Sequence, residues 1–221
     1  LGACGSSGTQ EIKPAEAEVT AEAVQEESAR LNAWFEEKFQ EAIARSPMAQ
    51  TYLGIKTDYD KWDDASYQNA EAELNIQRQN IAYMKEHFDY DLLDDQTKLS
   101  WRLAEYELAR DEAAFPYWYY TYTFNQMFGV QSGIPAFLVN QHRIATLEDA
   151  EAYVSRLQGV SEYLGQNVNN AEASAGMGIL PPAFVFEHVL REAGKEWGKS
   201  SEWIEPVAAK NKKPKKPKRK S

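Results

Sequence analysis

The 221-residue sequence predicts an all-α fold. Apolar residues recur three and four positions apart through most of the chain, which is the period of an amphipathic helix. Alternating segments joined by a tight turn, the pattern of a β-hairpin, are not evident. Residues that commonly cap helices precede several of the periodic segments, and these caps place the helix starts.

Two helices are predicted before residue 90. The first ends at Ser46-Pro47, and its apolar positions are Leu31, Trp34, Phe35, Phe39, Ala42 and Ile43. Residues 52–64 contain Gly54 and many aspartates, so we expect a loop there. The positions that repeat along the second helix are Ala70, Leu74, Gln77, Ile81, Met84 and Phe88.

Asp94-Asp95 can cap a third helix, because an aspartate side chain accepts hydrogen bonds from the free backbone amides of a first turn. One face of this helix carries Leu99, Leu103, Tyr106 and Arg110, and another carries Trp101 and Leu108. We expect both faces to be partly buried.

The segment Phe115–Phe124 holds seven aromatic residues in ten positions. Its high β-propensity competes with the helical neighbours, so its secondary structure stays open. Such a run usually packs in a core, and the alternative is that it lines a ligand groove. The candidate groove residues are Trp118, Tyr120, His142 and Arg143.

Two more helices follow a turn that we predict over Gly129–Pro135. Thr146 to Asp149 match a capping box and open the longest helix, which Gly176 and Gly178 end. Its apolar stripe is Ala150, Tyr153, Val154, Leu157, Val160, Leu164 and Val168. Pro181-Pro182 can start a short final helix, whose face is Phe184, Val185, His188, Val189 and Ala193.

Charge divides the chain into an acidic body and a basic end. The formal net charge is −10, yet residues 210–220 carry 8 of the 24 basic side chains and leave a net charge of −18 before them. An acidic body argues against nucleic-acid binding. We therefore assign residues 20–193 to one helical domain and residues 194–221 to a Lys/Pro-rich, disordered tail. That tail is either simply solvated or attracted to an anionic envelope surface.

The sole cysteine, Cys4, follows Leu1-Gly2-Ala3 and precedes a Gly/Ser-rich stretch. This arrangement resembles the lipobox of bacterial lipoproteins, in which the cysteine is lipidated. The alternative is a flexible N-terminus with an incidental cysteine. We favour a lipid anchor at Cys4, with residues 1–19 as its tether, and hence a location on the periplasmic side of the outer or inner membrane.

The sequence contains few patterns that indicate catalysis or metal binding. A His-Glu-x-x-His zinc motif and a Gly-x-Ser-x-Gly elbow are both absent from the sequence. His188 and Glu192 are four apart on a predicted helix, but two ligands make an incomplete metal site, so a structural role is favoured. His142 precedes the capping box, where a histidine more often hydrogen-bonds loop backbone than performs catalysis. We predict no catalytic residue, metal ligand or cofactor.

Several separated blocks resemble the N-terminal part of bacterial proteins grouped as domain of unknown function 885. The blocks are residues 46–55, 61–66, 128–135, 149–157 and 178–182. The resemblance covers about residues 25–193. It implies an α-helical fold of the zinc-metallopeptidase kind, and it agrees with Cys4 because many members are lipoproteins.

The resemblance also implies that the family's zinc helix lies in a C-terminal half, and no position of this sequence matches it. Zinc is therefore expected for full-length members only. Our first hypothesis is a truncated, lipid-anchored envelope protein without catalysis of its own. The others are a peptide-binding envelope module and half of a split peptidase completed by another chain.

Overall fold

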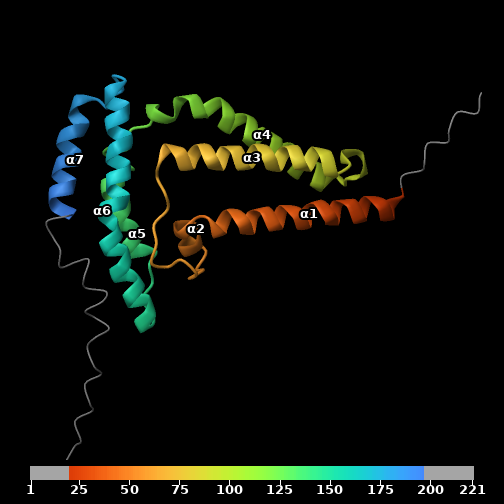
Figure 1. The fold of residues 1–221 in the computed structure, drawn as a ribbon, viewed down its shortest axis with the longest axis horizontal. Coiled ribbons are helices and arrows are strands. Elements are labelled where there is room, and N and C mark those ends of the chain that lie inside the picture. The colour runs from red at the N-terminus through yellow and green to blue at the C-terminus, as the bar shows by residue number, and fades with distance from the viewer. Residues whose placement is uncertain (1–19, 197–221) are drawn as a thin grey trace, which may run out of the picture.

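The computed structural model describes residues 20–196, and throughout this part of the chain the regular structure is helical (Figure 1). The prediction of an all-α fold is confirmed. The elements are α1 (Ala21–Ala44), α2 (Pro47–Tyr52), α3 (Tyr67–His87), η1 (Tyr90–Leu92), α4 (Asp95–Ala114), η2 (Phe115–Tyr120), α5 (Val130–Asn140), α6 (Leu147–Gly176) and α7 (Ala183–Glu196). Cys4 and the basic tail lie outside the described residues. None of the described helices combines the length and the apolar character needed to cross a membrane.

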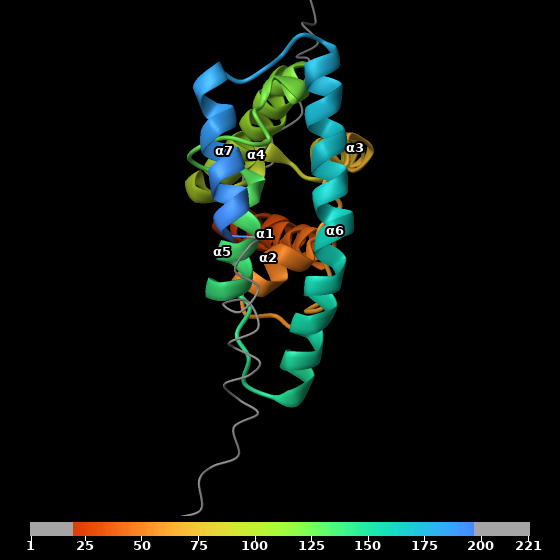
Figure 2. The same ribbon diagram turned by 90° about the vertical axis from the view of Figure 1, so that its left-hand side faces the viewer.

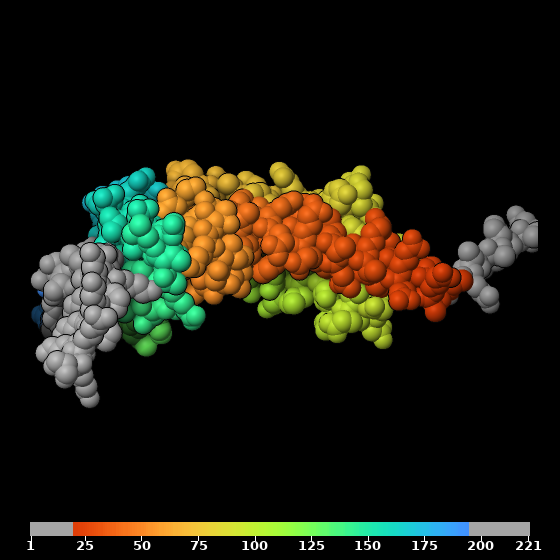
Figure 3. Space-filling model, turned by 90° about the horizontal axis from the view of Figure 1, so that it is seen from below, coloured from red at the N-terminus to blue at the C-terminus, as the bar shows by residue number. Residues whose placement is uncertain are grey.

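The helices form two groups that cross each other. Helices α1, α3 and α4 run side by side along the length of the molecule, and α5, α6 and α7 stand across one end (Figures 1 and 2). The space-filling view shows the elongated shape, with α1 extending away from the end that α6 occupies (Figure 3). The short helix α2 and the loop over residues 53–66 lie between the two groups.

Polar N-caps fix where five of the helices begin. The side chains of five cap residues each accept a hydrogen bond from the backbone N–H three positions on: Thr20, Ser46, Ser66, Asp94 and Thr146. Each such bond stabilises a helix by about 1 kcal/mol. The capping box at Thr146 is complete, because Asp149 accepts in return from the Thr146 backbone. The predicted caps at Asp94 and Thr146 are confirmed.

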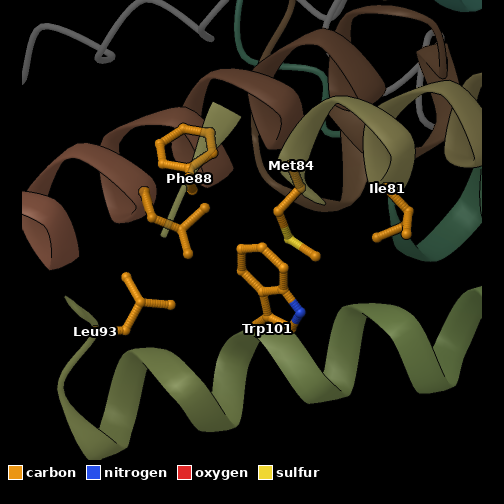
Figure 4. Close-up of a cluster of buried hydrophobic side chains, with 6 residues drawn as sticks. Ile81, Met84, Phe88, Leu93 and Trp101 are labelled. Carbon is orange, nitrogen blue, oxygen red and sulfur yellow. The ribbon is translucent and has the colours of Figure 1, made fainter. Parts of the chain in front are cut away.

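The two groups of helices have separate hydrophobic cores. In the first, Leu31 from α1 meets side chains from α3, α4 and the turn between them: Ile81, Met84, Phe88, Leu93 and Trp101 (Figure 4). In the second, Ile134 and Leu138 of α5 pack on Tyr153 and Val160 of α6. Burying a side chain of this size stabilises the fold by about 1.5–3 kcal/mol, so both cores contribute substantially.

Two expectations about the elements were wrong. The predicted turn over Gly129–Pro135 is mostly the first half of α5, for which Gly129 is the N-cap. Pro135 removes only one helical hydrogen bond, and it is itself buried between Ile134 and Phe137, so packing outweighs that loss. In α4, the face that carries Leu99, Leu103 and Tyr106 is exposed, because only the opposite face with Trp101 meets the first core.

Candidate functional site

The aromatic segment begins as a continuation of α4. The backbone N–H of Phe115 still bonds to the carbonyl of Asp111, but Pro116 follows and cannot donate the next bond. The chain therefore tightens into the 3-10 turns of η2, with a kink at Tyr117 (φ −101°, ψ 17°). The result is a short, bent element rather than the strand that β-propensity would favour.

Tyr67, at the first turn of α3, anchors this element from the side. Its ring stacks on Tyr119 with centroids 5.4 Å apart, and it also meets Phe115 at 5.2 Å and Trp118 edge-on at 6.3 Å. Offset and edge-to-face ring pairs of this kind each add about 0.5–1.5 kcal/mol beyond their buried area. The inner rings of η2 are thereby held against α3.

The outer rings stay in solvent. Tyr117 is 61% exposed and Tyr120 is 60% exposed, and their rings meet edge-on at 5.6 Å. Between this pair and α3 lies a groove of about 700 Å³, a size that suits part of a peptide or a small ligand. Its lining comes from α3, the end of α4 and η2: Ala70, Glu73, Leu74, Gln77, Asp111, Ala114, Phe115, Tyr117, Trp118, Tyr120 and Thr121.

The structure thus divides the four candidate groove residues into two pairs. Trp118 and Tyr120 line this groove, whereas His142 and Arg143 lie in the connection between α5 and α6 and are not among its lining residues. His142 is buried, and Arg143 uses its backbone N–H to bond the Tyr59 hydroxyl at 2.7 Å. Sequence reasoning missed Leu74, Gln77 and Asp111, because their position on the groove depends on how α3 and α4 pack.

His142 belongs to a buried centre built around Arg156, whose side chain is fully buried. The guanidinium donates to the carbonyl of Lys61 at 2.9 Å, to the Thr51 hydroxyl at 2.7 Å and to His142 Nδ1 at 3.1 Å. It also lies 4.9 Å from the ring centroid of Phe137. These partners are neutral, so burial lowers the pKa of Arg156 to about 10, which leaves the guanidinium charged at neutral pH.

The arginine fixes the protonation of His142. A guanidinium can only donate, so Nδ1 must accept, and Nε2 carries the proton that it donates to the carbonyl of Asp149 at 3.0 Å. Burial, together with the nearby Arg156 charge, lowers the pKa of His142 to about 4. The imidazole is therefore neutral at pH 7, and its one backbone partner is the carbonyl of Asp149 in α6 rather than the loop backbone that the sequence predicted.

Asp149, in the first turn of α6, is the acidic residue of this buried centre. Burial alone would raise its pKa, but hydrogen bonds from Lys56 at 2.7 Å and from the backbone amides of Ala145 and Thr146 outweigh that effect and hold the pKa at about 2. Residues from α2, the 53–66 loop and α6 therefore meet at one buried polar centre. We interpret this centre as structural.

A zinc ion does not fit the residues described here. Over residues 20–196, no three His, Cys, Asp or Glu side chains are grouped so that they could hold a metal. The Glu192 carboxylate accepts from Gln131 at 3.1 Å, and His188 Nδ1 lies 2.6 Å from Arg191, so each of this pair has another partner.

Comparison with known protein families gives one match, to the family described as "Bacterial protein of unknown function (DUF885)", over residues 47–219. The chain belongs to this family. The match begins at α2 and leaves α1 outside it, and it continues past residue 193, where we expected the resemblance to end. No curated protein and no solved structure matches the chain.

Three of the five family blocks recognised in the sequence meet at the Arg156 centre. Thr51 comes from the first block, Lys61 from the second and Arg156 itself from the helix block. Trp62, also from the second block, donates its indole N–H to the Arg156 carbonyl at 2.8 Å. The sequence pattern therefore corresponds to a structural centre, and the groove beside η2 lies apart from it.

Proposed function

We propose that this DUF885 protein is a peptide-binding module of the bacterial cell envelope, held to the membrane by a lipid on Cys4. The helices bind a peptide in the η2 groove and do not cleave it. The observation that supports this proposal is the groove itself, which is lined by the half-buried Trp118, by the exposed Tyr117 and Tyr120, and by residues of α3.

The exposure of the tyrosines favours a binding role over a core role. A core aromatic residue buries most of its surface, whereas Tyr117 and Tyr120 leave about three fifths of theirs in water. Tyrosine rings presented on a fixed backbone supply contact area at a low cost in conformational entropy, which is why binding surfaces are rich in them. Phe115, Trp118 and Tyr119 carry the packing against Tyr67 and leave the outer rings free.

The test is selection of ligands from a random peptide library on the purified chain, followed by titration of the selected peptides against alanine variants. Tyr120→Ala removes a groove ring, and Tyr106→Ala removes a ring of matched exposure (63%) on α4 that does not line the groove. We expect Tyr120→Ala to weaken binding about tenfold and Tyr106→Ala to leave it unchanged.

Stability must be measured on the same variants, because a folding defect would also weaken binding. We expect both substitutions to cost less than about 1 kcal/mol, since both rings are exposed. Trp118→Ala should weaken binding further while the chain stays folded. A loss of stability that matches the loss of binding would identify these rings as core residues and defeat the proposal.

A further inference from the structure

The polar lining of the groove points to the charge of its ligand. Three side chains with acceptor oxygens line it, namely Glu73, Gln77 and Asp111, and no Lys, Arg or His does. The other polar side-chain groups of the lining are the hydroxyls of Tyr117, Tyr120 and Thr121 and the indole N–H of Trp118. The lining therefore lacks a cation and is suited to receive one.

Gln77 supplies an acceptor oxygen that receives no hydrogen bond from the described chain. Its amide nitrogen donates to Asp111 Oδ2 at 3.2 Å, and a carboxylate can only accept, so the orientation of the amide is fixed. Its Oε1 atom is consequently turned away from Asp111, and it is buried without a hydrogen-bond partner in the described chain. A buried acceptor in this state favours a ligand that brings an N–H group.

Asp111 keeps one oxygen without a cationic partner. Its Oδ1 atom accepts from Arg110 at 2.9 Å, but Oδ2 meets only the neutral amide of Gln77. Glu73 differs, because Arg45 binds both of its oxygens, at 2.7 and 2.9 Å. Asp111 is therefore the carboxylate with capacity for a second positive charge.

The aromatic rings of the groove and the net charge of the described chain also favour a cationic ligand. The faces of Trp118 and the outer tyrosines can attract a cation that lies on them. Over residues 20–196 the chain carries 29 acidic and 14 basic side chains, a net charge of −15 that draws cationic ligands toward the surface. An apolar channel with acceptors at its wall also suits a side chain that is apolar along its stem and charged at its end.

We propose that the groove selects peptides through a lysine or arginine side chain, with its stem on the η2 rings and its charged group at Asp111. This inference rests on the proposed function, since it names the class of peptide that the same groove binds. Glu73, the other carboxylate of the lining, has both oxygens bound by Arg45, whereas Asp111 keeps one oxygen without a cationic partner, which makes Asp111 the residue that decides the preference.

The experiment uses three synthetic peptides of one apolar sequence that differ at a single central position: lysine, norleucine or glutamate. Calorimetric titration of the full chain should give the order lysine, then norleucine, then glutamate. We expect about a tenfold difference in Kd between the first two at low salt, and a smaller one at high salt. A norleucine peptide that binds as tightly as the lysine peptide would overturn the inference.

Asp111→Asn tests the assigned residue, with Glu112→Gln as its control. Glu112 is the next residue of α4, pairs with Arg78 at 2.7 Å and does not line the groove, so its neutralisation removes the same charge elsewhere. We expect Asp111→Asn to abolish the preference for lysine and Glu112→Gln to retain it. If the two variants had equal effects, the preference for lysine would follow from the net charge of the protein alone, and the assignment to Asp111 would be refuted.

The outcomes separate the two proposals. If all three peptides bind equally and Tyr120→Ala weakens all of them, the groove binds peptides but the cationic preference is wrong. If none of them binds, and the random library also yields no ligand, the peptide-binding function fails together with the preference.

Discussion

Replacement of Arg156 by methionine tests how much the buried polar centre that joins α2, the 53–66 loop and α6 stabilises the protein. Methionine fills much of the same volume, but it donates no hydrogen bond. The carbonyl of Lys61, the Thr51 hydroxyl and His142 Nδ1 would each lose their donor. A buried polar atom left without a partner costs about 1–3 kcal/mol.

The expected net cost is smaller than the sum of these losses. Removing the guanidinium also removes the cost of keeping a charge out of water, and the space near Phe137 accepts an apolar side chain. We therefore expect Arg156→Met to lower the free energy of unfolding by about 3–5 kcal/mol. That is a large part of the roughly 5–15 kcal/mol that stabilises a typical domain.

Urea denaturation followed by circular dichroism measures this change, and Arg143→Met is the matched control. Arg143 is exposed, and only its backbone contacts the centre, so its replacement should stay within about 0.5 kcal/mol of the parent. Hydrogen exchange should show the loss of protection first in the loop over residues 53–66. If Arg156→Met were as stable as Arg143→Met, the reasoning about this centre would be wrong.

Three further predictions concern other parts of the chain. Because the pKa of His142 is lower in the folded state than the usual 6.5, the unfolded chain binds more protons between these values. Stability should fall by up to about 3 kcal/mol as the pH drops from 6.5 to 4, and His142→Asn should flatten that part of the pH profile of urea denaturation. Gly159→Ala should destabilise the protein, since the new Cβ would lie 3.1 Å from Trp62 Cδ1 and that ring is held in place by its hydrogen bond to the Arg156 carbonyl and by stacking on Tyr163. Gly165→Ala on the same helix meets open space and should stabilise by about 0.5–1 kcal/mol. Equal thermal shifts of the two variants would contradict this. Mass spectrometry of the native protein should find lipid on Cys4, and an unmodified thiol on an intact N-terminus would exclude the anchor.

Local signals in the sequence were sufficient for most helix boundaries. The caps at Asp94 and Thr146, and the stop at Ser46-Pro47, act within one turn of the chain, so they can be recognised without the fold. The Gly129–Pro135 prediction was wrong because the same local reasoning ignores packing, and packing of Ile134 and Phe137 decides that segment.

The Arg156 centre and the candidate groove both depend on contacts between residues far apart in the sequence, which no local pattern contains. Arg156 interrupts the apolar stripe of α6, and an arginine at such a position is usually expected to face solvent. It is nevertheless fully buried, because three distant segments supply acceptors for its guanidinium. Likewise, Gln77 and Asp111 lie 34 positions apart and meet only after α3 and α4 pack. The aromatic run was recognisable from the sequence, but its division into anchored and exposed rings follows from Tyr67.

The separation of the two hydrophobic cores has a consequence for how the chain responds to force. The cores have no buried residue in common, and Trp62 of the 53–66 loop packs against the second core and donates to the Arg156 carbonyl. Pulling on the two ends of the described chain in a single-molecule experiment should give two rupture events, since each core can yield while the other holds. Arg156→Met should lower the force of the event that involves α5 and α6, and leave the other unchanged.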